Sequence, residues 1–369
     1  MAMTTHYRPA KARINLEAIQ HNLRLAKAHA GTANVLAVIK ADAYGHGLEA
    51  VAKFLQQDTD EFGVASIDDV IRLRNIGIQH AITCLSGFYH QDELSLFVQH
   101  NATAVVYDES QLENLRTFPN EKGTLKVWLK IDTGMGRLGF HITDVERIVA
   151  ELYQLKGVEL LGILTHFANS DVPEDNKNQQ QLDLFINTII QLKSAYSDLK
   201  FSTSNSAATL SRTDCMFDLI RPGIMLYGVS PIIDQTAEDL DLSPAMTFES
   251  ELISVREVKK DSTVGYGCKW RAPNDIQVGV VAVGYGDGYP RHAPTGTPVL
   301  VNGQRTQLIG RVSMDLISID LSQMNAKVGD KVTLWGEGLP IEEIAASAGT
   351  ISYELLCGVT NRVQKIFDK

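Results

Sequence analysis

Apolar and polar positions follow a regular alternation over the first two thirds of the chain. From about residue 12 to residue 230, short apolar runs alternate with longer amphipathic stretches. Such alternation is typical of βα units around a parallel sheet. Eight apolar runs predict strands, namely VLAVIK (35–40), EFGVAS (61–66), AITCL (81–85), TAVVY (103–107), LKVWLKI (125–131), VELLGILTH (158–166), KFSTS (200–204) and LIRPGIMLYG (219–228). Eight units favour a closed (β/α)8 barrel of the TIM type over an open doubly wound sheet.

The stretches between these runs predict amphipathic helices. In NLEAIQHNLRLAKAHAG (15–31) apolar residues recur at spacings of three and four. Asn15 is suited to cap the start of this helix, and Gly31 is suited to end it. IDDVIRLRNIG (67–77) repeats the pattern, with Gly77 at its end.

The pattern changes after about residue 231. FESELISVREVK, QVGVVAVGYG, TPVLVNGQ, RTQLIGRVSMDLISIDL and DKVTLWGEG are β-rich and are separated by NG, GD and GYGDGYP turn signals. We therefore expect an α/β barrel in residues 1–235 and a mostly-β C-terminal domain in residues 236–369. The polar, acidic segment 234–241 is the predicted linker.

Charge and cysteine usage narrow the class of partner. A formal net charge of −10 and a pI near 5.5 argue against a nucleic-acid groove or an anionic membrane surface, and favour a small-molecule partner. The four cysteines are far apart and form no metal-ligand spacing, which predicts reduced thiols and a cytoplasmic protein. The N-terminus lacks the apolar core of a signal peptide, and no apolar run approaches the roughly 20 residues of a membrane span.

Several glycine and histidine patterns carry little weight. GMGRLG (134–139) matches the dinucleotide fingerprint, but it follows the fifth predicted strand instead of opening the fold. GYGDG (284–288) lies between two β runs and predicts a tight turn rather than a phosphate cradle. The ten histidines show no HExxH or similar spacing, so no metal site is expected.

The stretch AVIKADAYGHG (37–47) is the strongest candidate for chemistry. Lys40 stands at the end of an apolar run, where the active sites of barrels lie. A lysine used as an amine nucleophile needs a rigid strand end and partial desolvation to lower its pKa, whereas a salt-bridged lysine at the barrel mouth is the plainer interpretation. NSAA (205–208) and RPGIMLYG (221–228) also have plainer interpretations, as a helix cap and a turn. Together, however, they offer the hydroxyl, backbone N–H groups and ring-nitrogen partner that pyridoxal phosphate needs.

Seven motifs in one order carry a resemblance to a known family. AVIKADAYGHG, LKIDTGMGRLGF, LTHFANSD, NSAA, IRPGIMLYG, VGYG and GRVSMD are all present. With these motifs the chain closely resembles the alanine racemase family of pyridoxal-phosphate enzymes over nearly its whole length. The resemblance implies the interconversion of L-alanine and D-alanine by a barrel-plus-β-domain enzyme.

The resemblance implies a two-base mechanism. Lys40 would carry pyridoxal 5'-phosphate as an aldimine and serve as one proton-transfer base. Tyr266 would be the other base, reaching the opposite face of the substrate from the partner subunit of a head-to-tail homodimer. Inversion of a stereocentre requires a base on each face of the substrate, because one base removes the α-proton and the other returns a proton from the opposite side.

The resemblance also implies how the cofactor would be held. The phosphate would contact Tyr44, Ser206, Gly223, Ile224, Tyr285 and Tyr353. Arg221 would face the pyridine nitrogen. A guanidinium offers only donors, so it would keep that nitrogen unprotonated, weaken the ring as an electron sink and suppress transamination.

Further residues would support the substrate and the bases. His166 would bond between Arg221 and Tyr266, and Arg137 would contact the phenolic oxygen of the cofactor and the substrate carboxylate. The remaining implied residues are Lys130, which would position Arg137 and is carbamylated in many members; Met314, whose backbone N–H would bind the substrate carboxylate; and Asp315 beside it.

The family's entry corridor and one departure complete the set. Asp171, Arg291, Arg311 and Ile351 match corridor positions that would favour small amino acids. Some members have a histidine three residues before the Asn-Ser pair, where this chain has Ser202, so support of Arg221 is expected to be weaker or differently made.

Three other functions are compatible with parts of this pattern. A decarboxylase on a similar barrel would place a negatively charged carboxylate against the pyridine nitrogen. The residue implied here, Arg221, is instead positively charged. A non-catalytic pyridoxal-phosphate-binding protein would need Lys40 but no second base or second domain. A racemase of serine or lysine would keep the same bases and differ in its side-chain pocket. Alanine is the favoured substrate, in either cell-wall precursor supply or alanine catabolism.

Overall fold

The computed structural model describes residues 7–118 and 123–368 of the chain. It divides into two compact units. The barrel unit comprises Gln20–Ala43 and Leu48–Leu242, and the β unit comprises Met1–Ile19, Tyr44–Gly47 and Ser243–Lys369.

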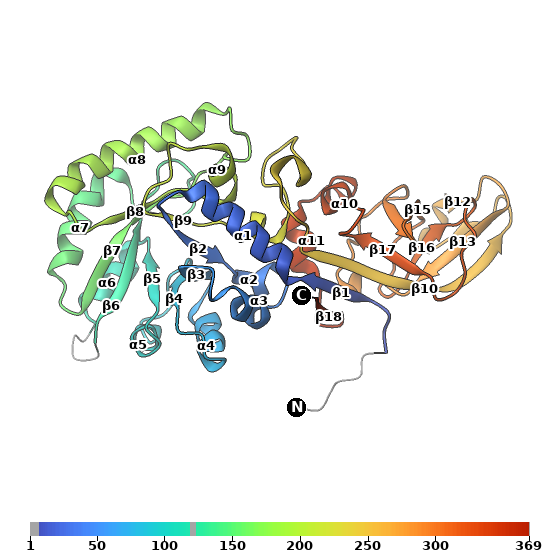
Figure 1. The fold of residues 1–369 in the computed structure, drawn as a ribbon, viewed down its shortest axis with the longest axis horizontal. Coiled ribbons are helices and arrows are strands. Elements are labelled where there is room, and N and C mark those ends of the chain that lie inside the picture. The colour runs from blue at the N-terminus through green and yellow to red at the C-terminus, as the bar shows by residue number, and fades with distance from the viewer. Residues whose placement is uncertain (1–6, 119–122, 369) are drawn as a thin grey trace. The chain divides into compact units, whose positions relative to one another are not determined.

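A parallel sheet of eight strands forms the centre of the barrel unit (Figure 1). Its strands are β2 (Asn34–Val38), β3 (Glu61–Val64), β4 (Ala81–Cys84), β5 (Thr103–Val106), β6 (Leu125–Lys130), β7 (Val158–Leu164), β8 (Lys200–Ser202) and β9 (Leu219–Ile220). Each strand pairs with its neighbour in sequence from β2 to β8, and β9 pairs with β2. The backbone N–H of Arg221 donates to the carbonyl of Ser204 at 2.9 Å, which links the remaining edges. The barrel is nearly closed, and the predicted fold class is confirmed.

The eighth predicted strand is much shorter than expected. LIRPGIMLYG forms only the two-residue strand β9, followed by a 3-10 helix η3 (Ile224–Tyr227). Pro222 has no N–H to donate to a ladder, and such a residue ends a central strand. The interpretation of the whole run as a strand was therefore correct only for its first two residues.

Helices lie on the outer side of these strands (Figure 1). They are α1 (Leu16–Ala30), α3 (Leu48–Leu55), α4 (Ile67–Asn75), α5 (Glu93–Gln99), α6 (Glu109–Arg116), α7 (Val145–Gln154), α8 (Asn176–Ala195) and the short α9 (Ser206–Ser211). The predicted ends of α1 are confirmed: the Asn15 side chain accepts the N–H of Ala18 at 2.9 Å, and Gly31 follows with φ +63°. The predicted end of α4 is also confirmed, since Gly77 has φ +89°.

The β unit is a closed antiparallel barrel extended by two strands. Its main strands are β1 (Lys11–Asn15), β10 (Met246–Val258), β13 (Ile276–Val281), β14 (Pro298–Val301), β15 (Gln304–Ile309), β16 (Ile317–Asp320), β17 (Lys331–Trp335) and β18 (Gln364–Asp368). The pairings run β10–β13–β16–β15–β14–β17 and return to β10, because the long β10 pairs with both β13 and β17. The short β11 (Thr263–Val264) and β12 (Trp270–Arg271) form a hairpin, and α10 (Ile341–Ala348) and α11 (Ser352–Gly358) complete the unit.

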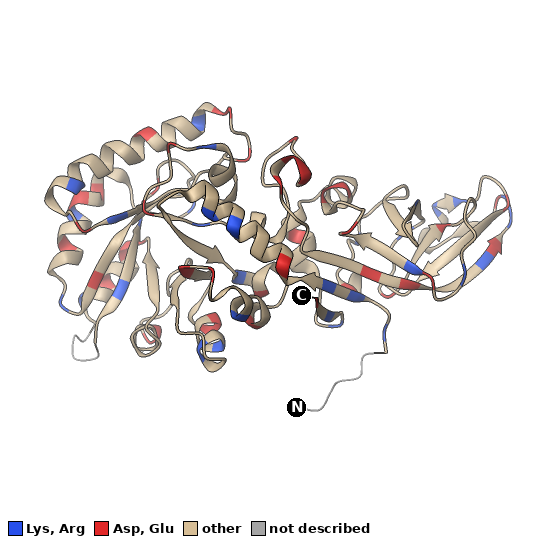
Figure 2. Cartoon of the chain, in the orientation of Figure 1, with Lys and Arg blue, Asp and Glu red and all other residues tan. Residues whose placement is uncertain are grey.

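Strand β1 differs from the expected division of the chain. We expected residues 11–15 to belong with the barrel part, but β1 pairs with β10 and β18 in the sheet of the β unit. Opposite charges accompany this pairing: Figure 2 shows basic positions on β1 and acidic positions on the adjoining part of β10. The Lys11 ammonium lies 3.8 Å from a Glu251 carboxylate oxygen. The chain therefore enters the β unit before the barrel begins, while the boundary at 235/236 stays a prediction.

Both units have apolar interiors. Three further findings concern membrane-spanning helices, metal sites and disulfide bonds. No helix of the described chain is long and apolar enough to cross a membrane. Within residues 7–118 and 123–368, no group of three His, Cys, Asp or Glu side chains could hold a metal ion. All four cysteines are free thiols.

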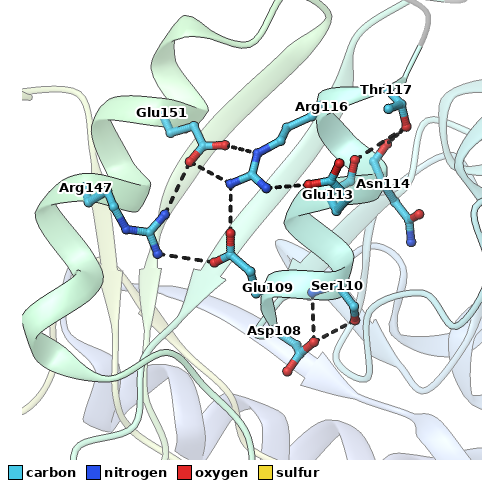
Figure 3. Close-up of polar contacts among 9 residues, drawn as sticks. All are labelled: Asp108, Glu109, Ser110, Glu113, Asn114, Arg116, Thr117, Arg147 and Glu151. Atoms are coloured by element: carbon cyan, nitrogen blue, oxygen red, sulfur yellow. Dashed lines mark hydrogen bonds and ion pairs between the residues drawn. The ribbon is translucent and has the colours of Figure 1, made fainter.

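An ion-pair network joins the neighbouring helices α6 and α7 of the barrel unit (Figure 3). The Arg116 guanidinium contacts a carboxylate oxygen of Glu109 at 2.8 Å, of Glu113 at 2.5 Å and of Glu151 at 2.5 Å. Arg147 approaches Glu109 at 3.2 Å and Glu151 at 3.5 Å. Hydrogen bonds from Arg116 lower the pKa of the Glu109 carboxyl, so this contact stabilises the folded chain while Glu109 is ionised.

We expect Arg116→Ala to lower the unfolding temperature at neutral pH, because it leaves three neighbouring carboxylates without their shared cation. A carboxyl whose pKa is lowered by folding stabilises the protein above its ordinary value of 4.5, and that contribution is lost as pH falls through the lowered pKa. The difference in unfolding temperature between Arg116→Ala and the unmodified protein should therefore become smaller at acidic pH and at high salt. Thermal unfolding at neutral and acidic pH measures it.

Arg24→Ala is the matched control, because Arg24 is exposed on α1 and forms no ion pair with the described residues. An equal loss in both variants would contradict the role of the network.

Candidate active site

Four of the predicted site residues lie at the C-terminal ends of barrel strands. Lys130 is the last residue of β6, and Arg221 directly follows β9. Lys40 and His166 each come two residues after a strand, namely β2 and β7. Parallel strands place these ends at one mouth of a barrel. Burial and then the positive charges of Arg221, Lys130 and Lys40 lower the pKa of His166, so these groups lie near one another.

Arg221 is held at this mouth almost entirely by neutral acceptors. Its guanidinium donates to the carbonyls of Thr165 at 2.6 Å and Thr203 at 3.2 Å, and to the hydroxyl of Ser202. The side chain is 5% exposed, and burial lowers its pKa to about 10. Arg221 therefore stays charged near neutral pH and offers only donors to any ligand.

Ser202 explains how Arg221 is supported without a histidine at that position. The Ser202 hydroxyl donates to the carbonyl of Leu219 at 2.5 Å and accepts from Arg221. One hydroxyl thus connects β8 to β9 and fixes the guanidinium. The support is differently made, as expected, and both residues are buried.

His166 is neutral, and its tautomer is set by Arg221. Its Nδ1 lies 3.3 Å from Nη2 of Arg221, and a guanidinium can only donate. Nδ1 must therefore be the acceptor, which places the ring proton on Nε2. Burial and then the positive charge of Arg221 lower the pKa of His166 well below its ordinary value.

Lys130 is an unusual lysine because it is buried among cations. It is 8% exposed. Burial, followed by the charges of Arg221, Arg137 and Lys40, lowers the pKa of Lys130 to about 8. About a tenth of this amine is consequently uncharged at pH 7, far more than for an ordinary lysine.

The loop that carries Arg137 is built around Asp132. The Asp132 carboxylate accepts the backbone N–H groups of Gly134 at 2.8 Å, Met135 at 2.9 Å and Gly136 at 3.0 Å. Although burial acts to raise it, these bonds hold the pKa of Asp132 below its ordinary value. No helix begins within GMGRLG, since the next helical residues are those of the 3-10 helix η2 (Ile142–Asp144) and of α7. GMGRLG is therefore a carboxylate-capped turn and not a dinucleotide fingerprint.

Gln181 is a site-supporting residue that sequence reasoning missed. It is fully buried on α8, accepts the N–H of Ala168 at 2.9 Å and donates to the carbonyl of His166 at 3.1 Å. It also donates to the hydroxyl of Thr133 at 3.2 Å, which connects the loops after β6 and β7. The surrounding NKNQQQ gives no signal, because a buried glutamine there has the same pattern as a solvated helix face.

Ser206 and Gly223 form a compact pair of polar groups in the barrel unit. Ser206 begins α9, where the Asn205 side chain accepts the N–H of Ala208 at 3.0 Å. The Ser206 hydroxyl accepts the N–H of Gly223 at 2.8 Å, and Ile224 follows at the start of η3. Backbone N–H groups and a hydroxyl at a helix start suit an anionic group such as a phosphate.

A left-handed turn joins Lys40 to Tyr44. The φ values from Ala41 to Tyr44 are between +51° and +55°, which L-residues adopt only at a cost. Asp42 holds the turn, since its carboxylate accepts the N–H of Leu48 at 3.0 Å and pairs with Arg72 at 3.2 Å. Lys40 itself is exposed, so the expected desolvation is not provided by the protomer.

Tyr44 is buried in the β unit beside Tyr353, with ring centroids 6.1 Å apart. Burial and then the Tyr353 hydroxyl raise the pKa of Tyr44, so its phenol stays a hydrogen-bond donor. Gly45 follows with φ +81°, and a Cβ there would lie 2.2 Å from the Leu356 carbonyl oxygen. The buried His46 donates from Nδ1 to the carbonyl of Tyr44 at 2.9 Å, which makes it structural.

Three further predicted residues, Tyr266, Met314 and Tyr285, lie on exposed turns of the β unit. Tyr266 is 69% exposed in a turn flanked by Gly265 and Gly267, whose φ values are +78° and +74°. Met314 is 52% exposed, and Tyr285 is 39% exposed in the η6 turn (Tyr285–Asp287). GYGDG is therefore a tight turn, as predicted.

The predicted corridor residues are divided between the units. Asp171 belongs to the barrel unit, whereas Arg291, Arg311 and Ile351 belong to the β unit. Ile351 is 62% exposed. Their gathering into one corridor stays a prediction.

Comparison with known proteins identifies the family. The family model of the alanine racemase N-terminal domain matches residues 14–231, and that of the C-terminal domain matches residues 245–367. The chain belongs to the alanine racemase family. It is therefore an isomerase of the racemase class.

Relatives of this family are similar over their whole length. The alanine racemase of Coxiella burnetii (strain RSA 493 / Nine Mile phase I) is 45% identical over 364 residues, which cover 97% of this chain and 98% of that protein. The alanine racemase of Nitrosospira multiformis is 44% identical over 361 residues, covering 97% and 99%.

Solved structures of the family share the architecture. The biosynthetic alanine racemase of Pseudomonas aeruginosa matches with a TM-score of 0.93 and 41% identity, covering 98% of this chain and 100% of that chain. The alanine racemase of Acinetobacter baumannii matches with a TM-score of 0.90 and 35% identity over the same shares.

The donor set of the barrel unit fits an anionic aldehyde cofactor. The exposed amine of Lys40 can react with a carbonyl, and it shares the barrel mouth with the cations Lys130 and Arg221. The Ser206 hydroxyl, whose oxygen accepts the N–H of Gly223, has its own proton to donate to a phosphate. Arg221 offers donors to an unprotonated ring nitrogen.

We expect Lys130 of the ligand-free protein to titrate with a midpoint near 8 instead of its ordinary 10.5. Because folding lowers this pKa, the charged amine destabilises the folded state, and the free energy of unfolding should rise with pH between about 8 and 10.5. NMR of 15N-lysine-labelled protein measures the midpoint, and Lys130→Met assigns the resonance and should abolish the rise. A midpoint near 10.5 would contradict the effect of the neighbouring cations.

Proposed function

We propose that this chain interconverts L-alanine and D-alanine with pyridoxal 5'-phosphate as its cofactor. The observation that supports this most directly is the buried guanidinium of Arg221, fixed by two carbonyls and Ser202 beside the neutral His166. A cation in this place disfavours protonation of the cofactor ring, which a decarboxylase would require. Family membership supports the same reaction.

Bound pyridoxal phosphate supplies an aldehyde that links to amines and a ring that acidifies the substrate α-proton. Lys40 would hold the cofactor covalently through its Nζ. Ser206, Gly223 and Ile224 of the barrel unit would bind the phosphate, together with Tyr44, Tyr285 and Tyr353 of the β unit. The high pKa of Tyr44 keeps its phenol protonated for this bond.

Two bases would act on opposite faces of the substrate. Once the substrate amine displaces Lys40, its amine would move a proton on one face, and the Tyr266 phenol would move a proton on the other. The Nε2–H of His166 is directed away from Arg221 and would donate to the Tyr266 oxygen, helping it act as a base.

Arg137, Lys130 and Met314 would orient the substrate carboxylate and the cofactor. Arg137 would bind the carboxylate and the phenolic oxygen of the cofactor. Lys130 has a lowered pKa, and its uncharged amine can accept CO2 to form a carbamate. Such a carbamate would place an anion between Arg137 and Arg221 and relieve the crowding of cations.

The exposure of Tyr266 and Met314 supports a shared site in a homodimer. A base that is 69% exposed in its own protomer has no enclosed site there. We infer that both residues act on the partner subunit's cofactor, with Asp315 beside Met314. Asp171, Arg291, Arg311 and Ile351 would then line a narrow polar corridor that selects small amino acids. Free thiols and the absence of a membrane-spanning helix in the described chain suit a cytoplasmic enzyme.

Incubation of the pyridoxal-phosphate-loaded protein with L-alanine in deuterated water should give D-alanine that carries deuterium at Cα. Proton abstraction followed by return of a solvent-derived proton requires this label. Chiral separation with mass analysis measures it. Serine and lysine, tested in the same way, should turn over more slowly.

L-alanine recovered unlabelled from a protein that still holds its cofactor would contradict racemisation and favour a binding protein. Faster turnover of serine or lysine would move the function to another amino acid.

Complementation between inactive variants tests the shared site. Lys40→Ala and Tyr266→Phe should each lose activity on the order of a hundredfold or more, because each lacks one base. Unfolding and refolding an equal mixture should restore roughly a quarter of the activity, because half of the dimers are hybrids with one intact site. A mixture that stays inactive would contradict sharing of Lys40 and Tyr266 between subunits. Refolding each variant alone is the control.

A further inference from the structure

Asp287 is a fully buried carboxylate of the β unit, where its turn, which contains Tyr285, contacts the turn that contains Met314. It is 0% exposed and lies in the η6 turn beside Tyr285. One of its oxygens accepts the backbone N–H of Gly284 at 3.0 Å. The guanidinium of Arg8, near the N-terminus, donates to both oxygens, from Nε at 2.9 Å and from Nη2 at 2.6 Å. This two-point geometry fixes direction as well as distance, which a lysine cannot do.

Arg8 also binds the turn that follows Met314. Its Nη2 donates to the Asp315 carbonyl at 2.8 Å. Arg362 contacts the same two residues, since its guanidinium donates to the Asp315 carboxylate at 2.5 Å and lies 3.5 Å from an oxygen of Asp287. Three segments far apart in sequence therefore meet at one buried carboxylate.

The turns that contain Tyr285 and Met314 pack backbone against backbone. The Tyr285 N–H donates to the Ser313 carbonyl at 3.0 Å, and the Gly286 N–H donates to the Met314 carbonyl at 2.9 Å. A Cβ at Gly284 would lie 2.3 Å from the Ser313 carbonyl oxygen. The contact therefore requires glycine, and any shift of the first turn is transmitted to the second.

The bond from Tyr285 sets the direction of the Met314 N–H. The Ser313 carbonyl and the Met314 N–H belong to one planar trans peptide, so they point in opposite directions. With the carbonyl bound by Tyr285, the N–H of Met314 points away from the η6 turn. Within the described residues it donates to no other group, and Met314 is exposed. The Tyr285 bond also polarises this peptide, which strengthens its N–H as a donor.

We propose that Arg8, through Asp287, is a positioning residue for substrate carboxylate binding by the Met314 N–H. The inference rests on the proposed function, in which that N–H binds the carboxylate. Without Arg8, a buried carboxylate would keep only the more distant Arg362 as a charged partner, and such a group moves toward water. The η6 turn would move with it, and the Met314 N–H would lose its direction.

Arg8→Gln should weaken alanine binding while leaving the chemistry intact. At saturating cofactor we expect KM for alanine to rise on the order of tenfold or more, while kcat stays within about twofold. A misdirected Met314 N–H would bind the carboxylate less well in both the ground state and the transition state, so binding is weakened and the chemical step is not. Arg8→Lys should recover only part of the loss, since one ammonium cannot span both oxygens of Asp287 and the Asp315 carbonyl.

Two readouts separate positioning from a general loss of structure. The first compares the equilibrium affinity of alanine with that of ethylamine, which is alanine without its carboxylate, and only the alanine affinity should fall. The second is independent of activity: the amide resonance of Met314 in 15N-methionine-labelled, cofactor-free protein should shift in Arg8→Gln.

Arg13→Gln is the matched control. Arg13 lies five residues away on β1, pairs with Asp368 at 2.8 Å and is more exposed, so the same charge is removed without touching Asp287. The control should leave the Met314 resonance, KM and both affinities unchanged.

An equal loss of alanine and ethylamine affinity, or no loss of either, would overturn the positioning role while the unmodified protein still racemises alanine. An unmodified protein that does not racemise alanine would instead overturn the proposed function, and the inference with it.

Discussion

The buried guanidinium of Arg221 is the constraint on which the barrel mouth depends. It is charged and 5% exposed, so it requires several acceptors at once, and the ends of β7, β8 and β9 provide them through Thr165, Ser202 and Thr203. None of these partners is an anion. The positive charge is therefore left to act on its surroundings, where burial and then this charge lower the pKa of His166 and Lys130. The mouth is prepared for a ligand that brings negative charge and an unprotonated ring nitrogen.

The β unit meets a different requirement, which is the precise direction of backbone groups. Asp287 accepts an N–H from its own turn and the two-point bond from Arg8, and the glycines at 284 and 286 allow two turns to touch through their backbones. Rigid turns can then present exposed groups, such as the Tyr266 phenol, without enclosing them. The barrel mouth thus concentrates positive charge near His166 and Lys130, whereas the β unit fixes the direction of backbone groups.

The sequence predicted the fold well wherever structure depends on local periodicity. The βα alternation, the cap at Asn15 and the turn at GYGDG were all correct, because each follows from side-chain spacing or backbone preference within a few residues. Prediction from the sequence failed where residues far apart in the chain determine the structure. β1 joined the β unit because its partners are β10 and β18, more than 200 residues away. Gln181 and Arg8 gave no signal, because a buried polar side chain and a solvated one have the same sequence pattern.

The sequence by itself determined the barrel and β-rich architecture and the family, and it predicted Lys40 and its candidate partners, since these depend on residue type, order and spacing. Only the tertiary structure decided which groups are charged, which are buried and in which direction their hydrogen-bonding atoms point. The tautomer of His166 depends on a donor-only neighbour, and the pKa of Lys130 depends on burial and on the neighbouring cations. The direction of the Met314 N–H depends on a bond from Tyr285. Distance and burial set each of these properties, and neither is defined until the chain has folded.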